Sequence, residues 1–333
     1  MFDRIITHDD FDGVISAALT AFVYHIDRFE FAGPRTITDN RFPITDADVV
    51  CDLPCPSEVG LWFDHHVGNL EDLGYLGRSA SDIPGRFDEK PSCARVIFDH
   101  FASEGLPARF APMVDEADRI DSFDWRSIED WRAETPGKTL DAAIKLMDAN
   151  RRDRFRFLER LVRALRDGEL QTVATLDWVA SRAQAYAEQE EAMVQKVQAD
   201  AVFLEADPRH EIVILDRTRH NQQDPIVKNL AYLCFPESLA VIEVKNRFRR
   251  GVKTNDLSLS MSLSLVLNGQ PHGKDVGEIM RRLNIGDGHA GAGAGTLDCA
   301  SKAEMLKEKD RVLAKIYEYW SDMSHELPAT SPQ

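Results

Sequence analysis

Long apolar runs are missing from this sequence. No stretch approaches the roughly 20 apolar residues that a membrane-spanning helix requires. The first residues, MFDRIITHDDFDG, also lack the basic and apolar regions of a secretory signal peptide. We therefore expect a cytoplasmic protein that does not enter a membrane.

Cysteine is scarce and scattered, with residues at Cys51, Cys55, Cys93, Cys234 and Cys299. An odd, dispersed set suits reduced thiols better than a disulfide framework. Cys51 and Cys55 flank Asp52 but lack the second pair of ligands that a zinc site needs. We expect both to be packing residues.

Positive charge is outweighed by negative charge. The chain has 40 Lys and Arg against 56 Asp and Glu, which gives a formal net charge of −16. Such a charge repels the phosphate groups of duplex DNA, so long nucleic acid is a poor first expectation for a partner. Part of this charge can instead be a cluster of aspartates that holds divalent cations.

The length of 333 residues exceeds the usual size of one hydrophobic core, which favours two domains with a site near their junction. A composition of 43% hydrophobic and 29% charged residues is typical of a folded protein. The pattern predicts a first domain over residues 1–150, a helical connector over 151–200 and a smaller second domain over 201–325. Residues 326–333 are expected to be a disordered tail.

The first domain alternates short apolar runs with helical patterns. The runs lie at residues 4–6, 48–51 and 60–63. Runs of this kind are typical of buried parallel strands in an α/β fold. Polar residues follow each run, namely the segment from His8, then Asp52, then the segment from Asp64. Because ligands bind outside the carboxyl ends of parallel strands, we expect these residues to meet at one place.

The second domain has the pattern of a mixed α/β layer. Strands are predicted near 211–215, 239–244 and 257–265, and helices near 275–283 and 300–320. The strictly alternating LSLSMSLSL at 257–265 predicts one buried face and one wet face. Residues 286–295 form a glycine-rich segment that we expect to be a loop.

The first polar segment, His8-Asp9-Asp10-Phe11-Asp12-Gly13, concentrates potential metal ligands. Alternate residues of an extended segment point the same way, so Asp10 and Asp12 are expected to share a face. Mixed nitrogen and oxygen donors suit Mn²⁺ better than Ca²⁺. The alternative is an acidic turn with a capping aspartate.

The second polar segment is Asp64-His65-His66. Adjacent histidines cannot face the same side in extended structure, so we expect different roles for them. One would bind metal and the other would contact a substrate phosphate. The alternative is a pair of surface histidines. Farther on, Asp118 and Asp121 lie three positions apart and would share one helix face.

These segments resemble the four motifs of the DHH phosphoesterases. The matching residues are His8-Asp10-Asp12-Gly13, Asp52, Asp64-His65-His66 and Asp121. That family includes single-strand exonucleases, nanoRNases, cyclic-dinucleotide phosphodiesterases, exopolyphosphatases and family II pyrophosphatases. The resemblance implies an α/β fold with an N-terminal parallel-sheet domain, a smaller C-terminal mixed-sheet domain and an active site in the cleft.

The resemblance also implies two Mn²⁺ ions, with Mg²⁺ as an alternative. One ion would be held by His8, Asp10 and Asp52, and the other by Asp12, Asp52, His65 and Asp121. Asp118 is the alternative to Asp121. His66 would neutralise a phosphate oxygen in the transition state, and Asp64 would orient a histidine.

The glycine-rich segment carries a second resemblance. Gly288-His289-Ala290-Gly291-Ala292-Gly293 resembles the GGHxxAxG loop of the DHH-associated C-terminal domain, with Asp287 where that family usually has glycine. The resemblance implies that Gly288, His289, Gly291 and Gly293 bind the substrate. The alternating strand has Met261 and no arginine, unlike nucleotide-handling relatives. A basic run at residues 246–253 would grip phosphates or form a solvated hairpin.

The sequence thus favours a Mn²⁺-dependent phosphodiesterase that cuts short oligonucleotides or dinucleotides to mononucleotides by two-metal catalysis. Alternatives are an exopolyphosphatase-like phosphohydrolase and, from another class, an inactive nucleotide-sensing module. The sequence is also compatible with a homodimer.

Overall fold

The computed structural model describes residues 2–41, 43–222, 226–268 and 272–323. The chain divides into two compact units. The first comprises Met1–Asp124 and Ala133–Gln189, and the second comprises Trp125–Arg132 and Glu190–Gln333. The expected domain boundary at residue 150 falls inside the first unit. The expected tail, residues 326–333, lies outside the described residues.

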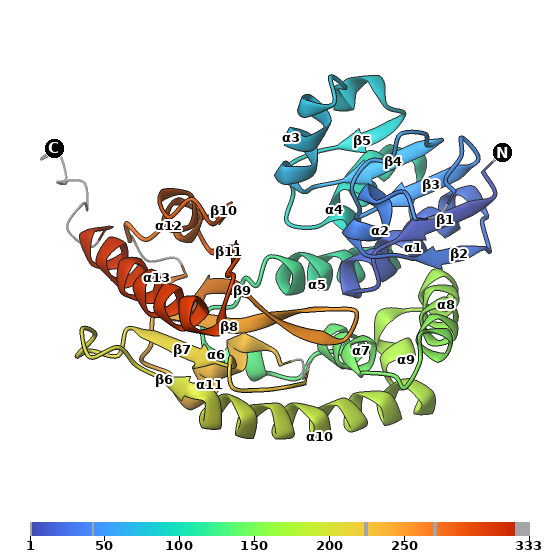
Figure 1. Cartoon of the computed structure of the whole chain (residues 1–333). Helices are drawn as coiled ribbons and strands as arrows, with labels where there is room; N and C mark the ends of the chain where they lie inside the picture. Colours follow the sequence, from blue (N-terminus) through green and yellow to red (C-terminus); the bar gives the residue numbers. More distant parts are fainter. Residues whose placement is uncertain (1, 42, 223–225, 269–271, 324–333) are drawn as a thin grey trace, which may run out of the picture. The chain divides into compact units, whose positions relative to one another are not determined.

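The first unit is built on a sheet of five parallel strands (Figure 1). In sheet order the strands are β2 (Phe29–Phe31), β1 (Arg4–Thr7), β3 (Asp48–Cys51), β4 (Leu61–Asp64) and β5 (Gly85–Phe87). The predicted parallel sheet is therefore confirmed. Thr7 pairs with Cys51 and Cys51 with Phe63, so β1, β3 and β4 end at the same edge. The polar motif residues follow these strand ends.

Helices cover both faces of this sheet. They are α1 (Phe11–Tyr24), α2 (Pro34–Thr38), α3 (Val67–Tyr75), α4 (Cys93–His100), α5 (Ala111–Asp121), α7 (Pro136–Lys145), α8 (Arg151–Asp167) and α9 (Leu170–Ala174), with short 3-10 turns at Ala80–Asp82, Ala102–Glu104 and Ala108–Phe110. Successive strand residues face opposite sides. Ile5 packs in one core cluster with residues of α1, α4, α5 and α8, whereas Ile6 packs in another with Ile37 of α2 and Leu73 of α3.

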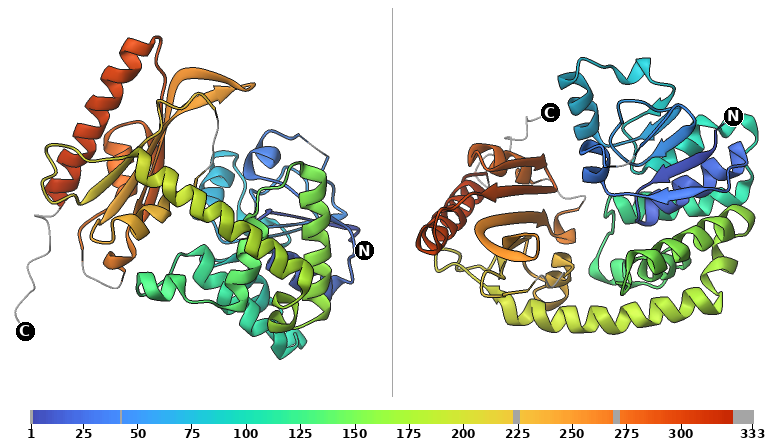
Figure 2. Two further views of the ribbon diagram at one scale, coloured as in Figure 1. Left: turned by 90° about the horizontal axis from the view of Figure 1, so that it is seen from below. Right: turned by 45° about the vertical axis from the view of Figure 1, so that its right-hand side comes forward.

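The segment expected to be a connector has two different parts. Leu158, Leu161 and Leu165 of α8 are buried in the same core cluster as α1, because their spacing makes an apolar stripe on one side of the helix. The helix α10 (Asp177–Asp200) passes from the first unit into the second, since the units divide between Gln189 and Glu190. Both views in Figure 2 show α10 as one long unbroken helix.

The second unit is built on a mixed sheet of six strands. In sheet order the strands are β10 (Gly286–His289), β11 (Ala292–Leu297), β9 (Val252–Leu263), β8 (Ala240–Arg249), β7 (Ile212–Asp216) and β6 (Ala201–Val202). The pair β7–β8 is parallel and the other pairs are antiparallel, which confirms the predicted mixed sheet. The helical segments are α6 (Ile128–Arg132), α11 (Ala231–Cys234), α12 (Val276–Arg282) and α13 (Lys302–Met323), with 3-10 turns at Lys228–Leu230 and Leu265–Leu267.

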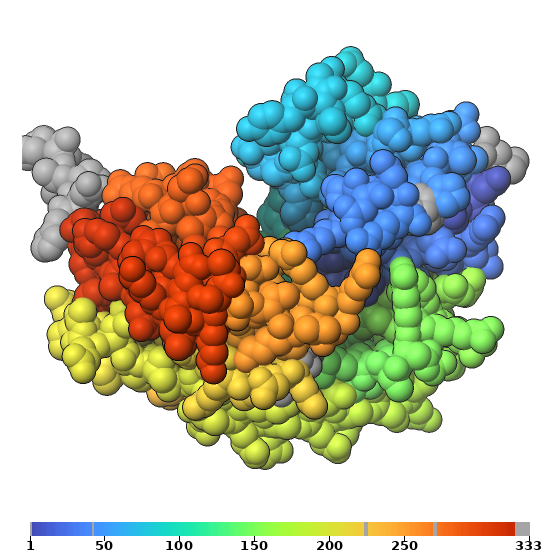
Figure 3. All heavy atoms as spheres, in the orientation of Figure 1, coloured from blue at the N-terminus to red at the C-terminus, as the bar shows by residue number. Residues whose placement is uncertain are grey.

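The alternating strand β9 has the buried face that its sequence predicts, but its other face is only partly wet, because Ser258 and Ser260 are half-buried and Ser262 is buried. Leu257, Leu259 and Met261 are buried in a core cluster with Trp320 of α13. The intervening Ser258 and Ser260, among others, point to the other face. The helix α13, red in the space-filling view, lies on the surface of the second unit (Figure 3). The basic run at residues 246–253 forms the hairpin between β8 and β9, as in one of its two interpretations.

The glycine-rich segment is a hairpin and not the loop that we expected. Gly288 pairs with Gly293 across β10 and β11, and β11 pairs in turn with β9. Glycine has a low intrinsic preference for β-strands, so this sequence did not predict a strand. The segment forms strands because β11 is hydrogen-bonded to β9. In the part of the chain that the structure describes, no helix is both long and apolar enough to cross a membrane.

Candidate metal centre

The loop between β1 and α1 places His8 and Asp10 at the carboxyl edge of the sheet. Asp10 is the N-cap of α1, and one of its carboxylate oxygens accepts a 2.9 Å hydrogen bond from the amide of Gly13. Its other oxygen lies 2.6 Å from Nδ1 of His8. Burial works against the charged form of Asp10, but the hydrogen bond and charge of His8 and the hydrogen bond from the Gly13 amide together outweigh it, and the pKa of Asp10 is lowered. Asp10 is therefore both a helix cap and a neighbour of the histidine.

Asp12 lies in the first turn of α1, so the extended segment that we expected here is wrong. Asp10 caps the helix that begins at Phe11, so the alternation expected of an extended segment does not apply to Asp10 and Asp12. Asp12 is 2% exposed and accepts hydrogen bonds from the amides of Cys93 (2.7 Å) and Ala94 (2.8 Å) at the start of α4. Burial raises the pKa of Asp12 to about 6, although His65 and these amides oppose the rise.

Asp52 follows β3 and lies between the donors of the other strands. Its backbone is left-handed, with φ of 58°, which aspartate tolerates better than most residues. Its carboxylate oxygens lie 3.8 Å from Nδ1 of His8 and 3.7 Å from Nε2 of His65. Both oxygens are buried without a hydrogen-bond partner among the described residues. Burial, and then the charge of Asp12, raises the pKa of Asp52 well above its usual value.

The two histidines after β4 have different surroundings. Nδ1 of His65 lies 2.9 Å from the carbonyl oxygen of Lys90, so Nδ1 carries the proton and Nε2 keeps its lone pair. That Nε2 is buried and has no hydrogen-bond partner in the described chain. Nδ1 of His66 lies 2.9 Å from Asp64, whose other oxygen accepts a 2.6 Å hydrogen bond from Asn69. His65 can thus offer a nitrogen to a cation, whereas His66 is held by Asp64.

The two candidate aspartates of the fourth motif, Asp118 and Asp121, lie at the end of α5 and have different partners. Asp118 accepts hydrogen bonds from Oγ of Ser92 (2.6 Å) and from Nε of Arg95 (2.8 Å). Asp121 instead places a carboxylate oxygen 3.4 Å from Nε2 of His65. Burial raises the pKa of Asp121 to about 8, and the nearby charge of Asp12 adds to the rise. Asp121, and not Asp118, therefore lies with the other donors.

Within the described residues, three groups of side chains have donor atoms that lie within 4.8 Å of one another. They are His8, Asp10 and Asp52; Asp12, His65 and Asp121; and Asp52, His65 and His66. Two donors that each lie about 2.1 Å from one ion are separated by about 3 to 4 Å. The distances of 3.4 to 3.8 Å around Asp52 and His65 agree with this geometry.

These donors fit divalent cations. Buried polar atoms normally have partners, yet both oxygens of Asp52 and Nε2 of His65 have none among the described residues. A cation would supply that partner and would offset the repulsion between the carboxylates. The mixture of imidazole and carboxylate suits Mn²⁺ and related divalent ions. The predicted ligands of the first unit are thus brought together, while their role stays a proposal.

The predicted substrate-binding residues Gly288, His289, Gly291 and Gly293 lie in the second unit, on the hairpin of β10 and β11. The strand β10 is exposed and lies at the edge of its sheet. Nδ1 of His289 accepts a 3.1 Å hydrogen bond from the amide of Gly291. Asp287, where glycine was expected, pairs with Arg281 at 2.7 Å. The hairpin is thus held by its own residues and by α12.

Two contacts at the candidate site were not predicted, one to Asp9 beside His8 and one to His65. Nε of Arg154 lies 2.8 Å from the carboxylate of Asp9, and its Nη2 donates to the backbone oxygen of Asp9 at 2.6 Å. The carbonyl of Lys90 orients His65. No spacing pattern signals either contact, because Arg154 lies 145 positions after Asp9 and a backbone carbonyl has no sequence signature.

Comparison with known proteins identifies the fold. No family model matches the sequence, and no curated protein matches it. Among solved structures, the chain is similar to the pGpG-specific phosphodiesterase PggH from Vibrio cholerae, with 20% identity and a TM-score of 0.68 over 95% of this chain and 99% of that one. It is also similar to the DHH domain of a member of a ribosomal-protein family, with 12% identity and a TM-score of 0.50 over 96% and 86% of the two chains. The chain has the DHH fold.

A third similar structure with the DHH fold is RecJ from Thermus thermophilus. In its complex with Mn²⁺ it shows 16% identity and a TM-score of 0.52, over 95% of this chain and 52% of RecJ. Its complex with Mg²⁺ gives a TM-score of 0.51. At these identities the likeness establishes the DHH fold, as the four motifs predicted.

Proposed function

We propose that this DHH-fold chain is a metal-dependent phosphodiesterase that hydrolyses dinucleotides or short oligonucleotides to mononucleotides. The observation that carries the proposal is the buried carboxylate of Asp52, whose oxygens lack a partner among the described residues and lie between two groups of donors. The fold is shared with a pGpG-specific phosphodiesterase and with RecJ complexes of Mn²⁺ and Mg²⁺. Together these features support phosphoester chemistry over a structural role.

The proposed site holds two divalent cations, with Mn²⁺ as the preferred ion and Mg²⁺ as the alternative. The first would be bound by His8, Asp10 and Asp52, and the second by Asp12, Asp52, His65 and Asp121. Two such cations, when bound, supply Lewis-acid chemistry and lower the pKa of water towards neutrality. The chain contributes donors that are fixed beforehand by the cap at Asp10, the amides at α4 and the Lys90 carbonyl.

We assign to His66 the neutralisation of a phosphate oxygen. Burial opposes its charged form, but the hydrogen bond and charge of Asp64, with the charges of Asp121 and Asp12, together outweigh burial and raise the pKa of His66 to about 9. A protonated imidazole at neutral pH donates a charge-assisted hydrogen bond to a developing oxyanion. The side chain of His66 is 48% exposed, so a substrate can reach it. Asp64 acts through His66 as a positioning residue and does not itself contact substrate.

We assign to Gly288, His289, Gly291 and Gly293 the binding of the distal part of the substrate. Closely spaced glycines leave backbone amides open to a phosphate. The exposure of β10 supports this assignment, because the backbone and the imidazole of His289 lie at the surface of the second unit. All five cysteines are free, which supports our assignment of the protein to a reducing compartment such as the cytoplasm.

An activity panel with metal add-back tests the proposed function. Chelated protein is given Mn²⁺ and then a 5′-phosphorylated dinucleotide, a long single strand or polyphosphate, and the products are separated by anion-exchange chromatography. We expect no turnover before Mn²⁺ is added, and afterwards at least about tenfold higher kcat/KM on the dinucleotide than on the long strand. If polyphosphate is the one substrate that is hydrolysed, the proposal is wrong and the protein is an exopolyphosphatase. Nucleotide binding without turnover on any substrate would favour the sensing module.

A further inference from the structure

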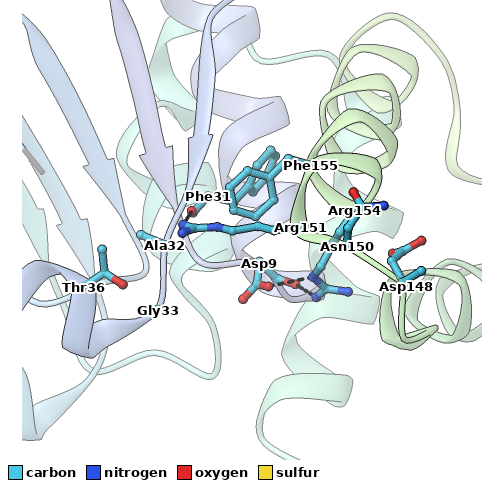
Figure 4. A pocket seen from close by; sticks show the side chains of 11 residues that line it. Asp9, Phe31, Ala32, Gly33, Thr36, Asp148, Asn150, Arg151, Arg154 and Phe155 are labelled. Carbon is cyan, nitrogen blue, oxygen red and sulfur yellow. Dashed lines mark hydrogen bonds and ion pairs between the residues drawn. The ribbon is translucent and has the colours of Figure 1, made fainter. Parts of the chain in front are cut away.

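A pocket of about 470 Å³ lies beside the metal donors within the first unit (Figure 4). It is lined by Asp9, Phe31, Ala32, Gly33, Thr36, Asp148, Ala149, Asn150, Arg151, Arg154 and Phe155. These residues come from the β1–α1 loop, from the end of β2 with the start of α2, and from the start of α8. The function proposed above does not use this pocket.

Asp9 connects the pocket to the metal donors. Its carboxylate lies 3.9 Å from Nε2 of His8 and 2.8 Å from Nε of Arg154. Arg154 also donates to the carbonyl oxygens of Asp9 and Ile144, at 2.6 Å each. Its donors are therefore largely satisfied, and it links α8 to the β1–α1 loop and to α7. A ligand in the pocket would lie one side chain away from a proposed metal ligand.

Other polar groups of the lining are also satisfied. Asp148 forms two hydrogen bonds with Arg182, at 2.7 and 2.8 Å. Asn150 caps α8, accepting from the amide of Asp153 and donating to its carboxylate. These groups shape the pocket but have little capacity left for a ligand.

Arg151 and Thr36 keep unused hydrogen-bonding capacity. The guanidinium of Arg151 lies 4.6 Å from the ring centre of Phe155 and makes one hydrogen bond, of 3.3 Å, to the carbonyl oxygen of Phe31. No ion pair of Arg151 and no side-chain hydrogen bond of Thr36 occurs in the part of the chain that the structure describes. Arginine has five N–H donors, so most of them stay available. Figure 4 shows Arg151 reaching from α8 towards Phe31, with Thr36 on the α2 side.

We propose that this pocket binds one nucleoside monophosphate unit of the substrate, next to the bond that is cut. Its volume is within the range of small-molecule sites and is far larger than an isolated phosphate needs. A guanidinium with free donors recognises a phosphate, and its stacking on Phe155 gives a flat surface that a base or sugar can cover. Arg151 holds the phosphate, and the hydroxyl of Thr36 bonds the nucleoside from the opposite wall. This assignment rests on the proposed function and adds a specificity-determining residue to it.

Two substitutions test the pocket without touching a metal ligand. Arg151→Ala removes the free cation. Gly33→Leu fills space, because the backbone of Gly33 is extended (φ −91°, ψ 161°) and an added Cβ would meet nothing within 4 Å. Arg152→Ala is the matched control, since Arg152 is exposed on the same helix and does not line the pocket. Circular dichroism and thermal melting verify that each variant is folded.

The readouts are kcat/KM with Mn²⁺ on a 5′-phosphorylated dinucleotide and on methyl p-nitrophenyl phosphate, a diester without a nucleoside. Binding of GMP and AMP to chelated protein is measured by calorimetry. We expect both pocket variants to lose about tenfold or more in dinucleotide kcat/KM and in mononucleotide affinity. Hydrolysis of the simple diester should match that of Arg152→Ala.

The outcomes separate this inference from the proposed function. If the wild type is active but both variants keep dinucleotide kcat/KM within about twofold of Arg152→Ala, the pocket assignment is wrong and the function stands. An equal loss on both substrates would also overturn it, because the variants would then act on the metal centre. If the wild type hydrolyses neither substrate, the proposed function fails and the assignment of the pocket to a substrate unit fails with it; mononucleotide binding that depends on Arg151 and Gly33 would then show a nucleotide-binding pocket without hydrolysis.

Discussion

Asp52→Asn is expected to lower Mn²⁺-dependent turnover by at least about 10³-fold while the chain stays folded. The carboxylate of Asp52 lies between the donors that follow β1 and β4, so both proposed ions depend on it. Asparagine keeps the shape of the side chain but removes its charge and one acceptor oxygen. The measurement is kcat/KM on a dinucleotide over a range of Mn²⁺ concentrations.

Asparagine is the appropriate substitute at this position for two reasons. The left-handed backbone of Asp52, with φ of 58°, is tolerated by asparagine but strains most other residues. The carboxylate is buried without a partner among the described residues, so removing its charge does not break a protein contact. We therefore expect metal-free Asp52→Asn to melt no lower than the metal-free wild type, and to gain less stability from Mn²⁺.

The matched control for this substitution is Asp72→Asn. Asp72 is an exposed aspartate on α3 of the same unit, and it is not among the donor groups. Its turnover and its melting temperature should equal those of the wild type. Turnover of Asp52→Asn within about tenfold of the control would show that hydrolysis does not require this carboxylate.

Gly13→Ala is expected to lower kcat/KM by about 10²-fold although every proposed ligand stays in place. Gly13 lies in the first turn of α1, where an added Cβ would collide with the carbonyl oxygen of His8 and lie 2.8 Å from its carbonyl carbon. Real Cβ atoms do not approach backbone this closely, so the His8 segment must move. That movement would displace His8 and Asp10 and would lower the free energy of unfolding by about 1–3 kcal/mol.

Gly74→Ala is the matched control for steric crowding. Gly74 is also helical, but an added Cβ there meets nothing within 4 Å. Alanine favours helix over glycine, so we expect unchanged kcat/KM and a gain of up to about 1 kcal/mol in the free energy of unfolding. Chemical denaturation and steady-state kinetics measure both variants. Equal behaviour of Gly13→Ala and Gly74→Ala would contradict the tight packing of the β1–α1 loop.

The sequence predicted the position of the donors well because strand topology fixes it. Apolar runs on successive residues indicated parallel strands, and parallel strands deliver their carboxyl ends to one edge. His8, Asp52 and His65 follow three such ends, and the sheet register brings them together. The apolar runs alone were sufficient to predict this proximity, because residues that follow neighbouring parallel strands lie at the same edge of the sheet.

The choice between Asp118 and Asp121 could not be made from the sequence. Both lie near the end of α5, three positions apart, and share one helix face. What separates them is tertiary structure, since Ser92 and Arg95 of the α4 segment engage Asp118. The cap at Asp10 similarly turned a predicted extended segment into helix.

Two further features, the glycine-rich hairpin and the pocket, could not be predicted because they depend on contacts between residues far apart in the sequence. The glycine-rich segment became a hairpin because β11 pairs with β9, and glycine itself gives no signal for a strand. The pocket beside the donors depends on Arg154 binding Asp9 across 145 positions of sequence. Such contacts become visible only when the helices are packed on the sheet.

Anomalous scattering at the manganese edge, measured on crystals of the wild-type chain soaked with Mn²⁺, tests the two-ion centre most directly. We expect two anomalous peaks in the first unit, both in contact with Asp52, one of them also beside His8 and the other also beside His65. A single peak, or peaks that leave the carboxylate of Asp52 without a contact, would contradict the two-metal site on which the proposed function depends.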